Sequence, residues 1–322
     1  MQAKLRTCSF FETLRILGDA NSEIDPREIF ASYVAALDDA DVVIPSYFSL
    51  AETYSIAEAK HLRWVPLFLG TTVLPTSENP HWAFEGFTLG LSCLNRYSYS
   101  LVKRNLWRKQ RERVNACRQE FLGLPPVTSP EGIMGMLHAD DDVTIHIAAS
   151  QLFAGPNLKL PEDVDASKVN YSGFLFPLGN QAGSSSLQAF IQQANNDIVP
   201  VIYISFGSMP TLEPLSLVQL IVQVCQTANC RCNVGVPQIP CPIMMDQFYN
   251  AKRMVQLGVA LTTIGSKQLT AVTVSKAVTA VLHNEKHVRM RAQEMAKYVT
   301  DESAGNLDRL CDQLLSTKGL FA

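Results

Sequence analysis

Short apolar runs alternate with segments of helical periodicity along much of the chain. A helix is expected over Ser49–Lys60, between the first two of these runs. The runs are rich in β-branched residues and are bounded by turn or polar residues, which is typical of buried strands. They are Asp41–Ser46, Trp64–Gly70, Val143–Ser150 and Val201–Phe206. Because apolar strands separated by helices favour parallel sheets with both faces covered, the pattern predicts an α/β fold.

Further helices are predicted in the middle and at the end of the chain. Residues Arg96–Phe121 carry apolar side chains at helical spacing, and Gly123 followed by two prolines should end that helix. The C-terminal part is mainly helical, with amphipathic segments at Gln247–Leu257, Thr270–His283, Glu285–Thr300 and Asn306–Leu315. The last two segments are expected to pack against a second sheet.

A polar run rich in Gly and Ser, GNQAGSSS at residues 179–186, is the clearest linker in the sequence. We place the domain boundary there. Residues 1–178 then form an N-terminal lobe and residues 187–322 a C-terminal lobe. The length of 322 residues is typical of about two domains.

Composition and charge exclude several classes of protein. The net charge of -3 gives no reason to expect binding to nucleic acid. The eight cysteines show no CxxC pair, which favours reduced thiols in a cytoplasmic protein. The one C-x-C, Cys230 and Cys232, lacks further ligands at zinc spacing, so we predict no metal site. The sequence shows neither a secretory signal peptide nor an apolar stretch long enough to span a membrane.

The segment Arg96–Phe121 is strongly basic, and two interpretations remain open. One is an amphipathic surface helix whose basic side is solvated, which is common on soluble domains. The other is peripheral membrane contact, in which the basic side meets anionic lipid headgroups.

Two segments of the C-terminal lobe have the form of a sugar-nucleotide site. Tyr203–Met209 reads YISFGSM, a strand followed by a turn in which Gly207 and Ser208 can approach a diphosphate. In Gly235–Gly258 a short strand leads into Asp246 and Gln247 and then into a helix. A carboxylate and an amide side by side offer both acceptors and donors to a polyol, although Asp246 is also placed to cap the helix.

Together with segments of the N-terminal lobe, these runs resemble UDP-sugar-dependent glycosyltransferases of the two-lobed GT-B type, and in particular the sterol and lipid glucosyltransferases. The N-terminal segments include Val73–Thr76 with Asn79–His81, the LGLPP run at Leu122–Pro126 and Asn170–Pro177. The resemblance implies two facing Rossmann-like lobes, with Asp246 and Gln247 on the donor sugar and Gly207 and Ser208 near its phosphates. It places Pro75, Thr76, Pro80 and His81 at the acceptor cleft.

Both lobes are incomplete relative to that family. The expected N-terminal strand, Gly-rich loop and helix, which would carry the histidine general base, are not found before Asp41, so no catalytic residue is assigned. His81 is interpreted as a loop or packing residue rather than as that base. The family's His-His-Gly-Gly stretch, which would hold the diphosphate, is also missing. Cys230–Val234 runs directly into Gly235, which we interpret as an internal deletion.

The resemblance implies an inverting transfer of a hexose, glucose being the expected one, from a UDP-sugar to a hydroxyl of a sterol or another lipophilic acceptor. No cofactor or metal is expected. The alternative is a catalytically inactive relative that binds a lipid or a partner protein. A NAD-dependent dehydrogenase is disfavoured, because no G-x-G-x-x-G follows a first strand.

Overall fold

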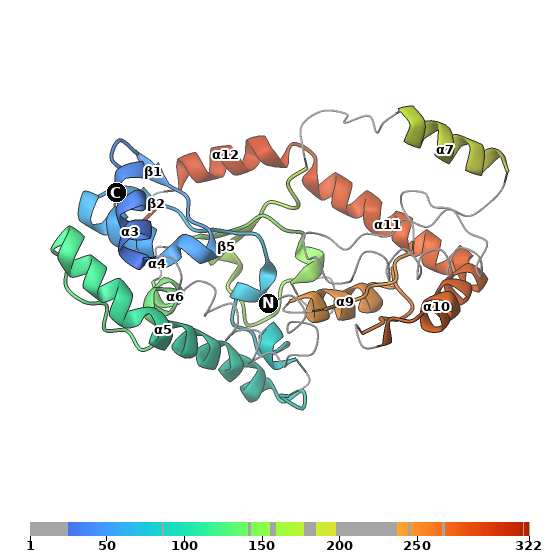
Figure 1. Cartoon of the computed structure of the whole chain (residues 1–322), viewed down its shortest axis with the longest axis horizontal. Helices are drawn as coiled ribbons and strands as arrows, with labels where there is room; N and C mark the ends of the chain where they lie inside the picture. Colours follow the sequence, from blue (N-terminus) through green and yellow to red (C-terminus); the bar gives the residue numbers. More distant parts are fainter. Residues whose placement is uncertain are drawn as a thin grey trace. The chain divides into compact units, whose positions relative to one another are not determined.

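The computed structural model of the chain contains parallel β-sheets and helices, and it divides into two compact units (Figure 1). Among the described residues, 25–175 and 301–321 form one unit, here called the sheet unit, and 176–300 form the other, called the helical unit. The structure describes residues 25–85, 87–140, 143–154, 159–176, 185–197, 237–243, 246–265, 268–317 and 319–321.

The strands of the sheet unit are short and parallel. Strand β1 (Val42–Val43) pairs with β2 (Arg63–Trp64), and β3 (Leu67–Phe68) pairs with β4 (Ile145–Ile147), which pairs with β5 (Val169–Tyr171). Backbone hydrogen bonds also join the two sheets, since the segment that contains β2 and β3 bonds to both neighbours. The amide of Val65 donates to Val43 at 2.9 Å, and the amide of His146 donates to Pro66 at 3.0 Å.

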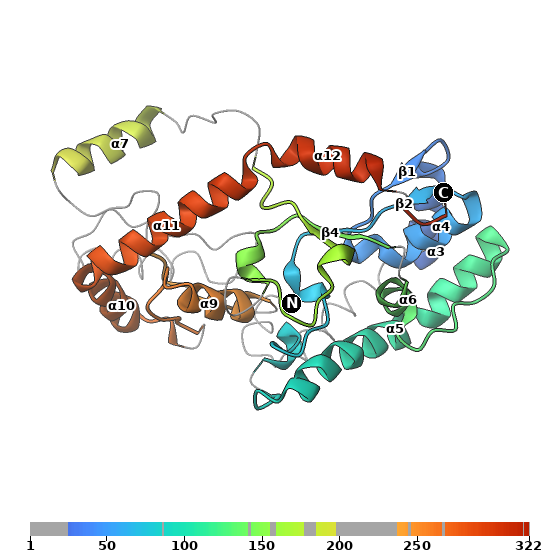
Figure 2. The same ribbon diagram turned by 180° about the vertical axis from the view of Figure 1, so that it is seen from behind.

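Helices cover both faces of this sheet. Along the segment that contains β2 and β3, Trp64 and Phe68 face one core, whereas Val65 and Leu67 face another. This alternation follows from the two-residue period of a strand. The first core is formed with α4 (Leu50–Lys60), α5 (Ser92–Leu122) and α6 (Gly132–Ala139), and the second with α12 (Asn306–Ser316), which lies on the opposite side of the strands (Figures 1 and 2).

Helix α5 is the longest element of the sheet unit and is held by a buried cation. Its inward face contributes Trp107 and Val114 to the core. Arg118 is also buried, and its guanidinium pairs with Glu58 at 2.8 Å and donates to Ser55 Oγ at 3.0 Å. A buried arginine of this kind is stable only because these partners replace its lost hydration. The helix ends at Gly123 with a φ of 65°, as the sequence predicted.

The prediction that the last helix packs against a second sheet is wrong. Leu310 and Leu314 of α12 pack on Val65 of the sheet unit. Arg63 donates from its guanidinium to the carbonyl oxygens of Leu314 and Leu315, both at 2.7 Å. These are carbonyls that the end of a helix leaves without intrahelical partners, so Arg63 caps α12 onto the sheet.

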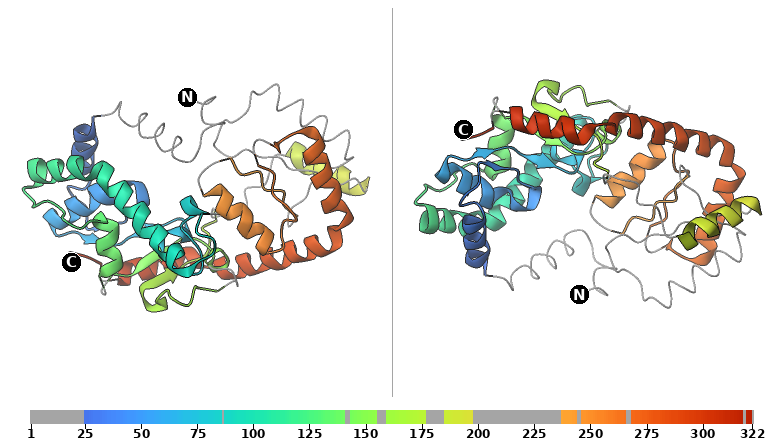
Figure 3. Two further views of the ribbon diagram at one scale, coloured as in Figure 1. Left: turned by 90° about the horizontal axis from the view of Figure 1, so that it is seen from below. Right: turned by 90° about the horizontal axis from the view of Figure 1, so that it is seen from above.

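The helical unit is built mainly from three helices of the C-terminal part. They are α9 (Gln247–Gln256), α10 (Ala271–His283) and α11 (Glu285–Ser303), and α7 (Ser185–Asn196) is also described (Figure 3). Gly258 follows α9 with a φ of 75°, as expected of a helix-ending glycine. Thr270 caps α10, its hydroxyl accepting from the amide of Thr273 at 3.2 Å.

Most of the predicted elements appear where the periodicity placed them, and the α/β fold class is confirmed. Strand Val201–Phe206 and most of the 179–186 linker lie outside the described residues, so the domain boundary stays a prediction. The sequence did not predict α6, α7, β5 or the helix α3 (Pro26–Ala36). The remaining short helices are 3-10 turns at Tyr47–Ser49, Thr71–Val73, Trp82–Phe84, Gln151–Phe153 and Ala166–Lys168.

Candidate functional site

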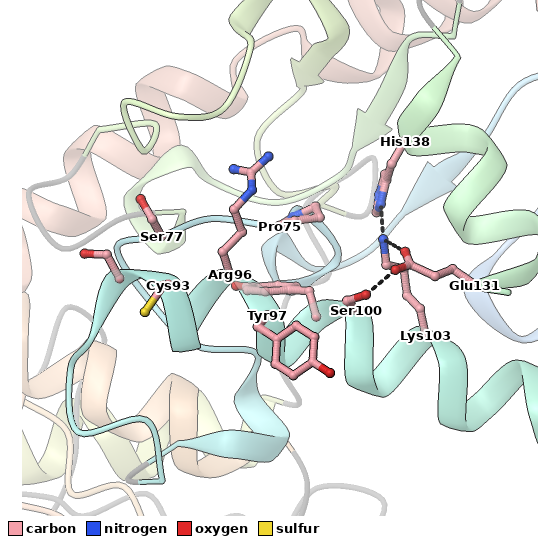
Figure 4. Close-up of a pocket in the computed structure, with 11 residues that line it drawn as sticks. Pro75, Ser77, Cys93, Arg96, Tyr97, Ser100, Lys103, Glu131 and His138 are labelled. Carbon is pink, nitrogen blue, oxygen red and sulfur yellow. Dashed lines mark hydrogen bonds and ion pairs between the residues drawn. The ribbon is translucent and has the colours of Figure 1, made fainter.

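A cavity of about 560 Å³ lies within the sheet unit, between the first turns of α5, helix α6 and the loop that follows Val73 (Figure 4). Its volume falls in the range of pockets that hold small ligands. It is lined by Pro75, Ser77, Ser92, Cys93, Arg96, Tyr97, Tyr99, Ser100, Lys103, Glu131 and His138.

A polar cluster occupies one end of this cavity. Glu131 pairs with Lys103 at 2.5 Å and accepts a hydrogen bond from the hydroxyl of Ser100 (Figure 4). Burial alone would raise the pKa of Glu131, but the hydrogen bonds from Lys103 and Ser100, together with the positive charges of Lys103 and Arg104, lower the pKa. Glu131 is therefore ionised near neutral pH and poorly suited to act as a general base, which needs a pKa close to the working pH.

His138 completes the cluster as a neutral imidazole. Burial, with a smaller contribution from the charge of Lys103, lowers its pKa to about 3. The ammonium of Lys103 lies 3.3 Å from Nδ1, which must accept this hydrogen bond, so the proton of the neutral ring is on Nε2. No described residue accepts a hydrogen bond from that Nε2. Within the cluster, the carboxylate of Glu131 therefore neutralises the charge of Lys103.

Two of the predicted acceptor residues, Pro75 and Thr76, belong to the loop that follows Val73. Pro75 lines the cavity directly. Thr76 donates to Asp163 at 2.7 Å, and the same carboxylate accepts from the amide of Ser77 at 2.7 Å and pairs with Arg96 at 2.9 Å. Burial would raise the pKa of Asp163, but these hydrogen bonds lower it. Asp163 therefore anchors the loop against the first turns of α5.

Pro80 and His81, the other predicted acceptor residues, are buried and do not line the cavity. The amide of His81 donates to Ser98 Oγ at 2.8 Å, and its Nδ1 accepts from the amide of Ala83 at 3.2 Å. Its ring packs edge-on against Tyr99, with ring centroids 5.4 Å apart. Burial lowers the pKa of His81 to about 4. His81 is thus placed to shape the wall through Tyr99, and contact of either residue with an acceptor stays a prediction.

The predicted donor residues lie in the helical unit. Asp246 is exposed and stands at the N-cap position of α9, but its side chain makes no capping hydrogen bond. Its carboxylate accepts a hydrogen bond from the side-chain amide of Asn250 at 3.3 Å. The side-chain oxygen of Gln247 accepts from the amide of Ile243 at 2.8 Å, which fixes the turn before the helix. Gly207 and Ser208 lie outside the described residues.

Sequence reasoning missed the polar cluster. Lys103 was interpreted only as one charge of a basic helix, and no sequence motif indicated a role for Ser100, Glu131 or His138. One signal was available: Ser100, Lys103 and Trp107 recur at helical spacing, which places a lysine on the same face as a buried tryptophan. Pairing of Lys103 with Glu131, which directly precedes α6, depends on tertiary packing, and no local pattern predicts it.

The chain matches sterol 3-beta-glucosyltransferases over most of its length. The protein of that name from Emericella nidulans is 24% identical over 336 residues, covering 85% of this chain and 23% of the relative. Those from Aspergillus terreus and Pichia angusta are 26% and 28% identical, covering 64% and 61% of this chain. The chain is thus similar to sterol 3-beta-glucosyltransferases. It spans only 14–26% of the length of these curated relatives.

The chain was also compared with protein-family models and with solved structures. No family model matches the chain. Among solved structures, the calicheamicin glycosyltransferase CalG4 matches with a TM-score of 0.44 and 17% identity, covering 93% of this chain and 80% of that one.

The match to the Emericella nidulans relative covers more positions than this chain contributes to it. It extends over 336 positions, more than the 322 residues of the whole chain, although it uses only 85% of them. The relative therefore carries residues inside the matched region that this chain lacks. Separately, no helix among the described residues is long and apolar enough to cross a membrane.

Proposed function

We propose that this chain derives from an enzyme that transfers glucose from UDP-glucose to the hydroxyl of a sterol or another lipophilic acceptor, with inversion at the sugar. The observation that carries the proposal is the sequence match to sterol 3-beta-glucosyltransferases over 85% of the chain. The names of these relatives specify the sugar and the acceptor of those proteins, and UDP as the carrier is inferred from the motifs.

The acceptor is proposed to bind in the cavity of the sheet unit. Pro75, Tyr97 and Tyr99 give it apolar and aromatic wall, and the cluster of Lys103, Glu131 and His138 gives it one polar end. A lipophilic alcohol has the same division, with a large apolar body and one hydroxyl. Polar groups at one end of an otherwise apolar pocket fix the orientation of such a ligand.

The donor sugar is proposed to bind at the start of α9. Asp246 is exposed there, so its carboxylate is available to sugar hydroxyls. Gln247 holds the preceding turn through Ile243, which fixes the position of both residues. The phosphates would lie near Gly207 and Ser208. We propose that no metal or cofactor takes part, since helix-end amides can hold a diphosphate by themselves.

Calorimetry with two ligands tests the donor site. We expect the double variant Asp246→Ala/Gln247→Ala to bind UDP-glucose about tenfold or more weakly than the wild type, because each lost hydrogen bond to a charged or polar group lowers affinity. Its affinity for UDP should be unchanged, since UDP lacks the glucose that these two residues are proposed to bind. The matched control is Val255→Ala, an exposed residue at the other end of the same helix.

Two outcomes would contradict the proposal. Equal affinities of the wild type and the double variant for UDP-glucose would remove Asp246 and Gln247 from the donor site. If the folded wild type bound neither ligand but retained a sterol, the chain would be an inactive relative that binds lipid. The missing phosphate-binding stretch is the observation that favours this second function.

A further inference from the structure

The loop before α5 exposes a run of large apolar side chains. Phe87 is 76% exposed, Leu89 85% and Leu91 52%, and Leu94 and Tyr97 on the first turns of α5 are also exposed. Soluble proteins commonly expose single apolar residues, but a contiguous set usually marks an interaction surface.

Backbone hydrogen bonds hold the loop before α5 in a defined conformation. The amides of Phe87 and Leu91 donate to the carbonyls of Phe84 and Thr88, both at 3.0 Å. Leu89 has a φ of 54°, a left-handed conformation that is costly for a residue with a side chain, and Gly90 follows at 73°. The fold thus holds Leu89 in an unfavourable backbone conformation while its side chain points into solvent. Such strain persists where the surrounding structure imposes it, often at functional surfaces.

A cationic stripe continues the apolar surface along α5. At 100° per residue, Leu94, Tyr97, Arg104, Arg108 and Arg111 fall within a sector about 100° wide, and all five are exposed. Trp107 and Arg118, which are buried, lie just beyond one edge of this sector, beside Arg111. The stripe is therefore apolar at the N-terminal end of α5 and cationic further along.

Two of the three arginines of the stripe are without an acidic partner in the described part of the chain. Among the described residues, Arg108 donates only to the neutral side chain of Asn105 at 3.2 Å, and Arg111 takes part in no ion pair. Arg104 lies 3.5 Å from Glu131 and stays about half exposed. Glu112, at the margin of the sector, is the nearest acidic residue along the helix. On the same helix Arg96, Arg113 and Arg118 pair with carboxylates at 2.8–3.0 Å, whereas Lys109, which lies outside the sector, has no ion pair among the described residues.

We propose that this surface, made of Phe87, Leu89, Leu91, Leu94, Tyr97, Arg104, Arg108 and Arg111, docks the protein onto a lipid bilayer that contains anionic headgroups. The apolar loop enters the interface, and α5 lies along the membrane with its arginines against the headgroup phosphates. Apolar side chains beside a row of cations are the combination that holds peripheral helices at such interfaces.

Charge selects this occupant over a second copy of the chain. A symmetric dimer would bring the stripe against its own copy, and the arginines would repel one another. An anionic bilayer instead supplies the opposite charge together with an apolar phase for Phe87 and Leu89.

The docking surface also adjoins the cavity, since Tyr97 belongs to both and Arg96 and Cys93 line the cavity from the same turns of α5 (Figure 4). If the cavity holds the acceptor, as in the proposed function, a lipophilic alcohol could pass from the bilayer into it without crossing water. Membrane binding itself does not depend on glycosyl transfer and is measured without any nucleotide.

Co-sedimentation with vesicles tests the docking surface. We expect the wild type to sediment with vesicles of phosphatidylcholine and phosphatidylserine. It should bind much more weakly to vesicles of pure phosphatidylcholine, and its binding to the anionic vesicles should weaken at high salt. Arg108→Glu/Arg111→Glu should weaken binding to the anionic vesicles about tenfold or more, because two attractive charges become repulsive. Phe87→Ser/Leu89→Ser should weaken binding to both kinds of vesicle.

Matched variants on other exposed surfaces serve as controls. Lys286→Glu/Lys297→Glu makes the same charge change, and Val272→Ser/Leu315→Ser makes the same apolar-to-polar change. Both should bind vesicles like the wild type. The proposal is overturned if the wild type does not bind anionic vesicles, or if the control variants lose as much binding as the variants of the docking surface. A failure to bind UDP, by contrast, would affect only the proposed function.

Discussion

His81 illustrates how burial sets the chemistry of a single residue. It is 8% exposed, and burial lowers its pKa to about 4. In an unfolded chain an imidazole titrates near 6.5. As the pH falls from about 6.5 to about 4, the unfolded chain takes up a proton that the folded protein does not bind. The free energy of unfolding should therefore decrease by up to roughly 3 kcal/mol over this range and level off below it.

Replacing His81 separates its contribution from that of other titrating groups. We expect His81→Asn, which keeps an acceptor for the amide of Ala83, to lose less stability between about pH 7 and pH 4 than the wild type does. Urea unfolding at several pH values measures this difference. Identical pH dependence of the two proteins would show that the unfolding free energy does not depend on protonation of His81.

The site residues differ in how far the sequence alone could identify them. Pro75 was predicted at the acceptor cleft from a motif, and it lines the cavity. Lys103 was not singled out, because its position on a basic helix resembles a solvated charge. What distinguishes it is the ion pair with Glu131 on the approach to α6, and the two residues are brought together only by packing. Residue types and local spacing carry no information about such a contact.

At the scale of elements, α12 offers a direct comparison of neighbouring leucines. Leu310 and Leu314 are buried against Val65, whereas Leu315 is 67% exposed. We expect Leu314→Ala to lower the free energy of unfolding by about 2–5 kcal/mol, since it removes buried apolar atoms and leaves a cavity. Leu315→Ala should change it by less than about 0.5 kcal/mol. Thermal or urea unfolding measures both, and similar effects would mean that α12 is not docked through Leu314.

Periodicity predicted the existence of α12 but not its partner. An amphipathic pattern shows which side of a helix is buried, and several sheet faces of the same chain can satisfy it. The contacts that decide the partner are long-range. Arg63 caps the helix end, and His146 on β4 contacts Thr317 at 3.2 Å. Strand β5 was missed for a related reason, because its central residue, Asn170, is polar and bonds to Gln313 and His146 rather than to an apolar core.

For the whole molecule, the order of most of the described strands and helices was predictable, because each of these elements repeats a short period over several residues. The α/β class followed from that order. What the sequence added beyond the fold was the interruption between Val234 and Gly235, where family-like segments adjoin without the expected phosphate-binding stretch. The match to the Emericella nidulans relative does not locate any gap, so a deletion at this junction stays a prediction.

Inserting the missing segment tests this interpretation at the level of the complete chain. We expect that placing the phosphate-binding segment of a full-length sterol glucosyltransferase between Val234 and Gly235 raises the affinity for UDP by about tenfold or more, because backbone amides at a helix N-terminus hold a diphosphate. The control is a Gly- and Ser-rich insertion of equal length, which restores chain length without those amides. Calorimetry with UDP compares the two. If both insertions gave the affinity of the unmodified chain, the interruption would not be what limits nucleotide binding, and the donor site would have to be sought away from this junction.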